Sequence, residues 1–203
     1  MSFFPERPDP ADPMPEYRQP VWADAPDDIL PGIVPTQVVL GRSDNAVVQF
    51  KTVRAYPTGL QISLAVRVRH LNPRKYLADE LLPEGPTRHA GQLKWGMEFA
   101  DGSKVTNVDP LQQPEQQDQQ AATTGPDYRP DWQPRPPLLL YTGGSGDSRS
   151  VDLDYWLWPL PPPGTLRVVC QWHSQGIEQT THDLDAQLFL NAAAQARSVW
   201  PTT

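Results

Sequence analysis

Apolar side chains alternate with mostly polar ones through residues 60–70, which read LQISLAVRVRH. Successive side chains of a β-strand point to opposite faces, so this pattern predicts a strand with one buried face and one solvated face. A strand that is wet on one side is typical of an antiparallel sheet, because parallel sheets are usually covered on both faces. The expected fold class is therefore antiparallel β.

Several other short runs carry β-branched and aromatic residues between turn signals. They are residues 36–42, 46–56, 93–99, 104–108, 137–141, 151–158, 165–173 and 177–184. Short strands at this spacing predict an all-β fold, an antiparallel β-sandwich of the Ig-like or jelly-roll kind. Within residues 46–56 the apolar set changes parity between Phe50 and Val53, which predicts a β-bulge.

Two segments in the C-terminal half of the chain are predicted not to be strands. The glycine-rich run at residues 142–150, TGGSGDSRS, predicts a loop. Residues 185–197 are rich in alanine and leucine and predict one short C-terminal helix, with Asp183 or Asp185 as its cap.

The distribution of proline divides the chain into an N-terminal segment and a single domain. Nine of its 25 prolines fall within residues 1–35, and proline fits neither a helix interior nor a central strand. Residues 1–31 therefore predict an extended strap that docks aromatic side chains such as Trp22, and residues 32–203 a single sandwich domain. Inside that domain, residues 109–137 contain QQPEQQDQQ and predict a disordered or surface loop.

The formal net charge of −7 and the scattered basic residues argue against nucleic acid and anionic membranes as partners. The single cysteine, Cys170, excludes an intrachain disulfide and a cysteine-based zinc site. The N-terminal run MSFFPERPDP lacks the apolar stretch of a secretion signal, and no run has the length of a membrane span. We expect a cytoplasmic protein.

One strand face carries the candidate binding surface. Asp152, Asp154, Trp156 and Trp158 alternate along residues 151–158, and Trp22 of the strap joins them as a candidate. The two aspartates fit either an acid–base pair acting on a glycoside or a solvated strand face, and we favour the solvated face. The tryptophans fit either internal cover by the helix, by Trp200 or by the strap, or an exposed stacking platform; internal cover is favoured.

No other pattern indicates catalysis. The four histidines lack metal-ligand spacing, and Cys170 shares a strand face with apolar residues. Ser145 lacks the Gly-x-Ser-x-Gly frame of a nucleophile turn, and the glycines around it lack the Gly-Lys-Ser/Thr of a phosphate loop. We therefore expect no catalytic residue, cofactor or metal.

The run WLWPLPPPGTLRVVCQW, followed by GIEQTTHDLD and an alanine-rich segment ending in Val199-Trp200-Pro201, resembles a family of uncharacterised proteins from high-GC, actinobacterial-type bacteria. VVLGRSDNAVVQFKTVRAYPTGL and WGMEFADGSKV resemble the same family. The resemblance covers roughly residues 26–200 and rests on the motif W-x-W-P-L-P-P-P-G. It implies one shared architecture and transfers no functional residue.

These observations favour a non-enzymatic accessory or scaffold module that binds a protein partner. A carbohydrate-binding module that uses the tryptophans as a platform is the alternative, and a hydrolase without an identifiable catalytic set comes third. Exposed sheet edges also offer a route to a homo-oligomer.

Overall fold

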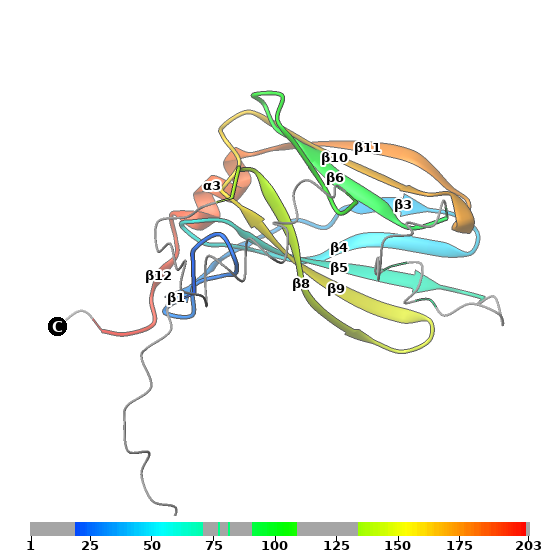
Figure 1. Cartoon of the computed structure of the whole chain (residues 1–203), viewed down its shortest axis with the longest axis horizontal. Helices are drawn as coiled ribbons and strands as arrows, with labels where there is room; N and C mark the ends of the chain where they lie inside the picture. The colour runs from blue at the N-terminus through cyan, green and yellow to red at the C-terminus, as the bar shows by residue number, and fades with distance from the viewer. Residues whose placement is uncertain (1–18, 71–76, 78–80, 82–90, 109–133, 202–203) are drawn as a thin grey trace, which may run out of the picture.

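The computed structural model describes residues 19–70, 77, 81, 91–108 and 134–201 (Figure 1). Most of these residues form antiparallel strands, which stack as two layers around one apolar core. The predicted all-β sandwich with one short helix is confirmed. Within the same residues, none of the helices combines the length and the apolar character needed to cross a membrane.

The larger sheet has six strands in the order β2-β4-β5-β9-β8, with β3 also pairing to β4 beside β2. All its pairings are antiparallel. The strands are β2 Gly32–Val34, β3 Val39–Arg42, β4 Ala46–Ala55, β5 Leu60–Val68, β8 Leu138–Gly146 and β9 Ser150–Trp158.

The smaller sheet has four strands in the order β11-β10-β6-β7. These are β6 Lys94–Glu98, β7 Lys104–Thr106, β10 Thr165–Trp172 and β11 Ile177–Asp185. A 3-10 turn, η1 His173–Gln175, joins β10 to β11, and the helix α3 Gln187–Ala193 follows. Two short strands, β1 Ile29–Leu30 and β12 Arg197–Ser198, pair with each other outside both layers.

The alternation along β5 sets which side chains enter the core. Leu60, Ile62 and Leu64 are fully buried and lie opposite inward-facing residues of β9, whereas Ser63 lies opposite Asp154 on the other face. One face of the six-stranded sheet is therefore core, and the face that carries Asp154 is the outer face, as the period of two predicts.

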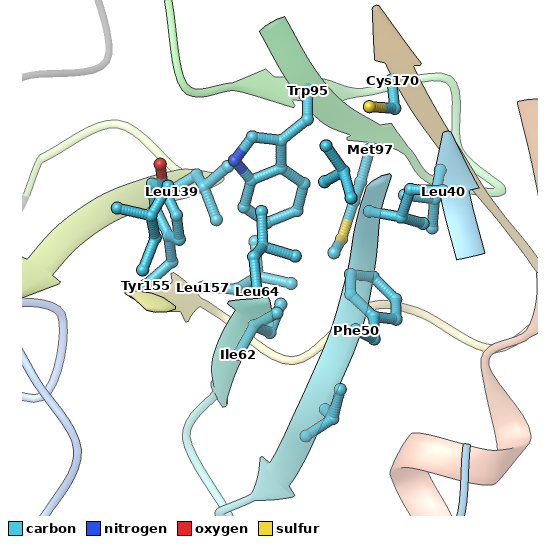
Figure 2. Close-up of a cluster of buried hydrophobic side chains, with 14 of the residues drawn as sticks. Leu40, Phe50, Ile62, Leu64, Trp95, Met97, Leu139, Tyr155, Leu157 and Cys170 are labelled. Atoms are coloured by element: carbon cyan, nitrogen blue, oxygen red, sulfur yellow. The ribbon is translucent and has the colours of Figure 1, made fainter. Parts of the chain in front are cut away.

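Trp95 of β6 connects the two layers at the centre of the core (Figure 2). Its ring meets Phe50 of β4 and Tyr155 of β9 edge-on, with centroid separations of 6.4 and 4.9 Å. Edge-to-face aromatic pairs contribute about 0.5–1.5 kcal/mol beyond the area that they bury. The predicted bulge is also present, because the register between β4 and β5 shifts between Phe50 and Thr52.

Two local predictions are corrected. Residues 142–146, predicted as part of a loop, continue β8 and pair with β9, so the turn itself covers only the residues around Asp147 and Ser148. The helix is shorter than residues 185–197, because Asp185 still pairs with Thr165 and Arg197 pairs with Leu30. Most of the predicted loop at 109–137 lies outside the described residues.

The helix start also differs in detail from the prediction. The N-cap residue is Ala186, which makes no side-chain capping bond, and Asp183 instead forms an ion pair with Arg167. Asp185 does accept a hydrogen bond from the Gln187 amide, at 2.8 Å. A carboxylate at this place satisfies one of the free amides of the first helical turn.

Candidate functional site

The outer face of β9 carries Trp156, and the described part of the strap, residues 19–31, covers it. Trp156 is 0% exposed, and its indole nitrogen donates a hydrogen bond to the Val21 carbonyl at 3.3 Å. A turn in which the Ala23 amide donates to the Pro20 carbonyl brackets Val21 and Trp22, and Trp22 is itself 2% exposed. Neither indole ring offers a free face to a ligand.

The sheet side of the Trp156 ring is closed as well. Tyr56 meets the ring edge-on at a centroid separation of 5.7 Å. Gly59 lies so close that an added Cβ would stand 2.7 Å from the Trp156 ring. Trp158, two residues further along β9, is only half-buried and lies opposite Leu138 of β8. Trp156 and Trp158 therefore differ sharply in exposure although they share a strand face.

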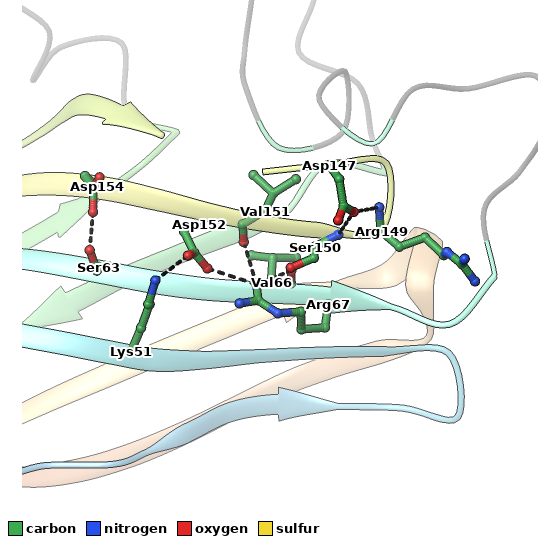
Figure 3. Close-up of polar contacts among 10 residues, drawn as sticks. All are labelled: Lys51, Ser63, Val66, Arg67, Asp147, Arg149, Ser150, Val151, Asp152 and Asp154. Carbon is green, nitrogen blue, oxygen red and sulfur yellow. Dashed lines mark hydrogen bonds and ion pairs between the residues drawn. The ribbon is translucent and has the colours of Figure 1, made fainter. Parts of the chain in front are cut away.

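Asp152 forms the centre of a small ion-pair network on the same face (Figure 3). Lys51 Nζ lies 2.5 Å from its carboxylate, and Arg67 donates to it at 2.9 Å. Partial burial by itself raises the pKa of Asp152, but the hydrogen bonds from Lys51 and Arg67 outweigh burial and lower the pKa below its ordinary value. Asp152 is held as a carboxylate.

Asp154 lies outside this ion-pair network and accepts a hydrogen bond of its own. The hydroxyl of Ser63 donates to its Oδ1, and Ser63 lies directly opposite it on β5. A glycosidase acid needs a carboxyl whose pKa is raised, beside a second carboxyl across a cleft. Asp152 has the opposite shift, so this pair has the environment of a solvated strand face that carries ion pairs.

Among the described residues, Cys170, His173 and His182 are either buried or in contact with other polar groups. Cys170 is fully buried, and burial raises the pKa of its thiol to about 12. His182 lies 3.0 Å from the Leu40 carbonyl, and His173 lies 3.5 Å from Glu178. In the part of the chain that the structure describes, no cluster of three or more His, Cys, Asp or Glu side chains is arranged to hold a metal ion.

Most sheet edges are closed. At one side of the sandwich, Thr180 and His182 of β11 reach across to the Leu40 carbonyl of β3 and join the two layers. At the same side, α3 lies on β2 so tightly that a Cβ at Gly32 would meet the Ala192 carbonyl oxygen at 1.8 Å. The edge strand β7 is three residues long and begins with the charged Lys104.

The edge of β8 is different. β8 pairs with β9 on one side, and no other described strand pairs with its far side. Residues 141–146 of this strand read YTGGSG, with neither charge nor proline, and all but Gly143 are exposed. Natural proteins usually protect edge strands with charge, proline or cover. We refer to residues 141–146 as the β8 edge.

The glycines shape this edge. A Cβ at Gly144 would stand 2.6 Å from the Asp152 carbonyl oxygen, and one at Gly146 would stand 2.2 Å from the Ser150 carbonyl oxygen. Both positions therefore exclude a side chain while the hairpin keeps its pairing. The sequence signal for the edge was this glycine run, which by itself is indistinguishable from a loop.

The direction of the main-chain groups follows from the hairpin turn. The Asp147 amide donates to the Ser150 carbonyl at 2.8 Å. In an antiparallel pair, residues alternate between facing the partner strand and facing away from it. Counting back from Asp147, the amide and carbonyl groups of Gly144 and Gly146 point away from β9, toward the open side.

Comparison with known proteins adds no family to this geometry: neither a protein-family model, nor a curated protein, nor a solved structure matches the chain.

Proposed function

We propose that this chain is a non-enzymatic accessory module that binds a protein partner, and that the partner adds an extended segment to the β8 edge. The observation that carries the proposal is the exposed, uncharged and proline-free edge at residues 141–146. Edge strands of this kind bind peptides by strand addition, in which main-chain hydrogen bonds supply affinity and flanking side chains supply specificity.

The edge provides both components. Gly144 and Gly146 turn main-chain donors and acceptors outward without side chains that crowd an incoming strand. Tyr141, 44% exposed, lies at the start of the edge, where its ring contacts Tyr155 at a centroid separation of 5.7 Å. An exposed aromatic ring next to free main-chain groups is a common anchor in protein interfaces.

The strap supports the site indirectly. It covers Trp156, which lies opposite Leu140 of β8, and so stabilises the layer from which β8 extends. Burial of Trp156 and Trp22 also leaves a sugar-stacking platform with only the half-buried Trp158, so the alternative of a carbohydrate-binding module has less support than the edge.

A charge-matched pair of variants tests the edge. Thr142→Lys/Ser145→Lys places lysines on β8, where they oppose strand addition. Gln179→Lys/Thr181→Lys makes the same charge change at exposed positions of β11 and serves as the control. A photo-crosslinking residue at Tyr141 of the full chain, introduced in its native host, reports which protein lies at the edge.

The proposal predicts one recurrent crosslinked protein, lost with the β8 variant and retained with the β11 control. Addition of that protein should slow hydrogen exchange at the Gly144 and Gly146 amides. Crosslinks that are equally strong in both variants would contradict the proposed edge. Crosslinks between two copies of this chain would replace the foreign partner with a homodimer.

A further inference from the structure

Three arginines line a recess at the end of the six-stranded sheet where β3, β4 and β5 meet. Its volume is about 450 Å³, within the range of small-molecule sites. The lining consists of Arg42, Ser43, Asp44, Asn45, Ala46, Val47, Arg67, Val68 and Arg69. This lining includes three arginines and one aspartate, on a chain whose formal net charge is −7.

Strand pairing places Arg42 and Arg67 on the same side of the sheet. Arg42 lies opposite Val47, and Val47 lies opposite Arg67, so the three residues form one row across the outer face. With strands about 4.8 Å apart, the backbones of Arg42 and Arg67 are about 10 Å apart, and Val47 forms the floor between them. Arg69 follows two residues after Arg67, in a bend just past the end of β5, and lines the same recess.

The charges in the recess are not neutralised equally. Arg67 is paired with Asp152 and also donates to the Val151 carbonyl at 3.1 Å. For the Arg42 and Arg69 side chains, no ion pair or hydrogen bond is found among the contacts of the described residues. Within the described residues, Arg42 and Arg69 therefore keep their donors available, and Asp44 is the only acidic residue among those that line the recess.

The frame of the recess is held by Asn45. The Asn45 side chain donates to the His70 carbonyl at 3.0 Å and to Gln175 Oε1 at 2.7 Å, and its own Oδ1 accepts from the His70 amide at 2.8 Å. The Asn45 carbonyl accepts from the Arg69 amide at 2.7 Å. These bonds fix the β3–β4 turn against the end of β5, so the arginine backbones are positioned before any ligand arrives.

We infer that this recess binds a small ligand with two or more oxyanion groups, held by Arg42 and Arg69 and oriented by the fixed Arg67. Guanidinium groups pair with phosphate and carboxylate through parallel hydrogen bonds, and the spacing of the arginines suits a multivalent anion better than a single one. The inference does not depend on the β8 edge, since the recess and the edge share no residue.

Calorimetric titration of the full chain at low salt tests this, with pyrophosphate and citrate as the phosphate and carboxylate probes. Arg42→Gln/Arg69→Gln removes the two available guanidinium groups. Arg54→Gln/Arg197→Gln makes the same charge change at exposed arginines outside the lining and is the control. A charged hydrogen bond is worth about tenfold in affinity, so the recess variant should bind roughly a hundredfold more weakly.

The control variant should bind with unchanged affinity, and the probe that binds more tightly identifies the natural oxyanion as phosphate or carboxylate. Added salt should weaken the binding, because the guanidinium groups are exposed. The inference is overturned if neither probe binds the wild-type chain, or if both double variants lose the same affinity. Neither result bears on the crosslinks from Tyr141.

Discussion

The indole nitrogen of Trp156 donates to the main-chain carbonyl of Val21 at 3.3 Å, across 135 positions of sequence. This bond fastens the strap to the outer face of β9. The same face carries Asp152 and Asp154, which remain partly exposed. One strand face therefore combines the buried Trp156 with the half-buried Trp158 and two partly exposed carboxylates.

Replacement of Trp156 should destabilise the fold. Removal of a fully buried tryptophan costs about 3–5 kcal/mol, because the apolar contacts are lost and a cavity remains. We expect Trp156→Ala to lower the free energy of unfolding by that amount in urea denaturation. Trp200→Ala is the control, since Trp200 is 70% exposed and should change stability by less than about 0.5 kcal/mol. A small loss at Trp156 would show that the strap does not cover it in solution.

Asp152 should contribute stability that depends on pH. Its pKa is lowered in the folded state, so its contribution is present above the pKa of the unfolded chain, near 4, and is lost as pH falls through the lower folded value. Because both cationic partners are substantially exposed, Asp152→Asn should cost roughly 0.5–1.5 kcal/mol at pH 7.

That difference between wild type and Asp152→Asn should shrink as the pH falls below about 4, and it should disappear once Asp152 is protonated in the folded chain as well. Unfolding curves measured between pH 3 and pH 7 check this, with the exposed Asp27→Asn as the control. A difference that stays constant across the range would mean that Asp152 acts through packing rather than through its charge.

A side chain at Gly146 should disturb the β8–β9 hairpin. An added Cβ would stand 2.2 Å from the Ser150 carbonyl oxygen, which belongs to the paired backbone and cannot move alone. Overpacking of this kind costs about 1–3 kcal/mol, so Gly146→Ala should lower stability by that amount. Hydrogen exchange in residues 150–153 should speed up locally. Ser145→Ala, on the same strand, should leave both stability and exchange unchanged.

Cys170 should be unreactive in the folded protein. Burial removes access and raises the pKa of the thiol to about 12, so the thiolate that attacks disulfide reagents is scarce at neutral pH. We expect an aromatic disulfide reagent at pH 8 to label Cys170 only after denaturant is added, at a rate limited by unfolding. Rapid labelling of the native chain would contradict its placement in the core.

The alternation through residues 60–68 determined by itself which side chains of β5 face the core. Side-chain direction along a strand is a local property with a period of two, so it can be read without knowledge of the neighbouring strands. The same reasoning located the bulge near Lys51, because an extra residue reverses the parity of every side chain after it. It also placed Asp152 and Trp156 together on one face.

Which side chains of that face are covered and which stay exposed was decided by tertiary structure alone. No local pattern distinguishes Trp156, which the strap covers, from Trp158, which it leaves half-exposed, because the cover comes from the far end of the chain. Residues 142–146 read as a loop because glycine has no side chain to show a period, and only the close approach of β9 makes them a strand. Likewise, Arg42 and Arg67 border one recess because two strand pairings place them in the same row. The direction of a side chain along a strand is a local property. Its exposure and its neighbours on adjacent strands depend on contacts between segments distant in sequence.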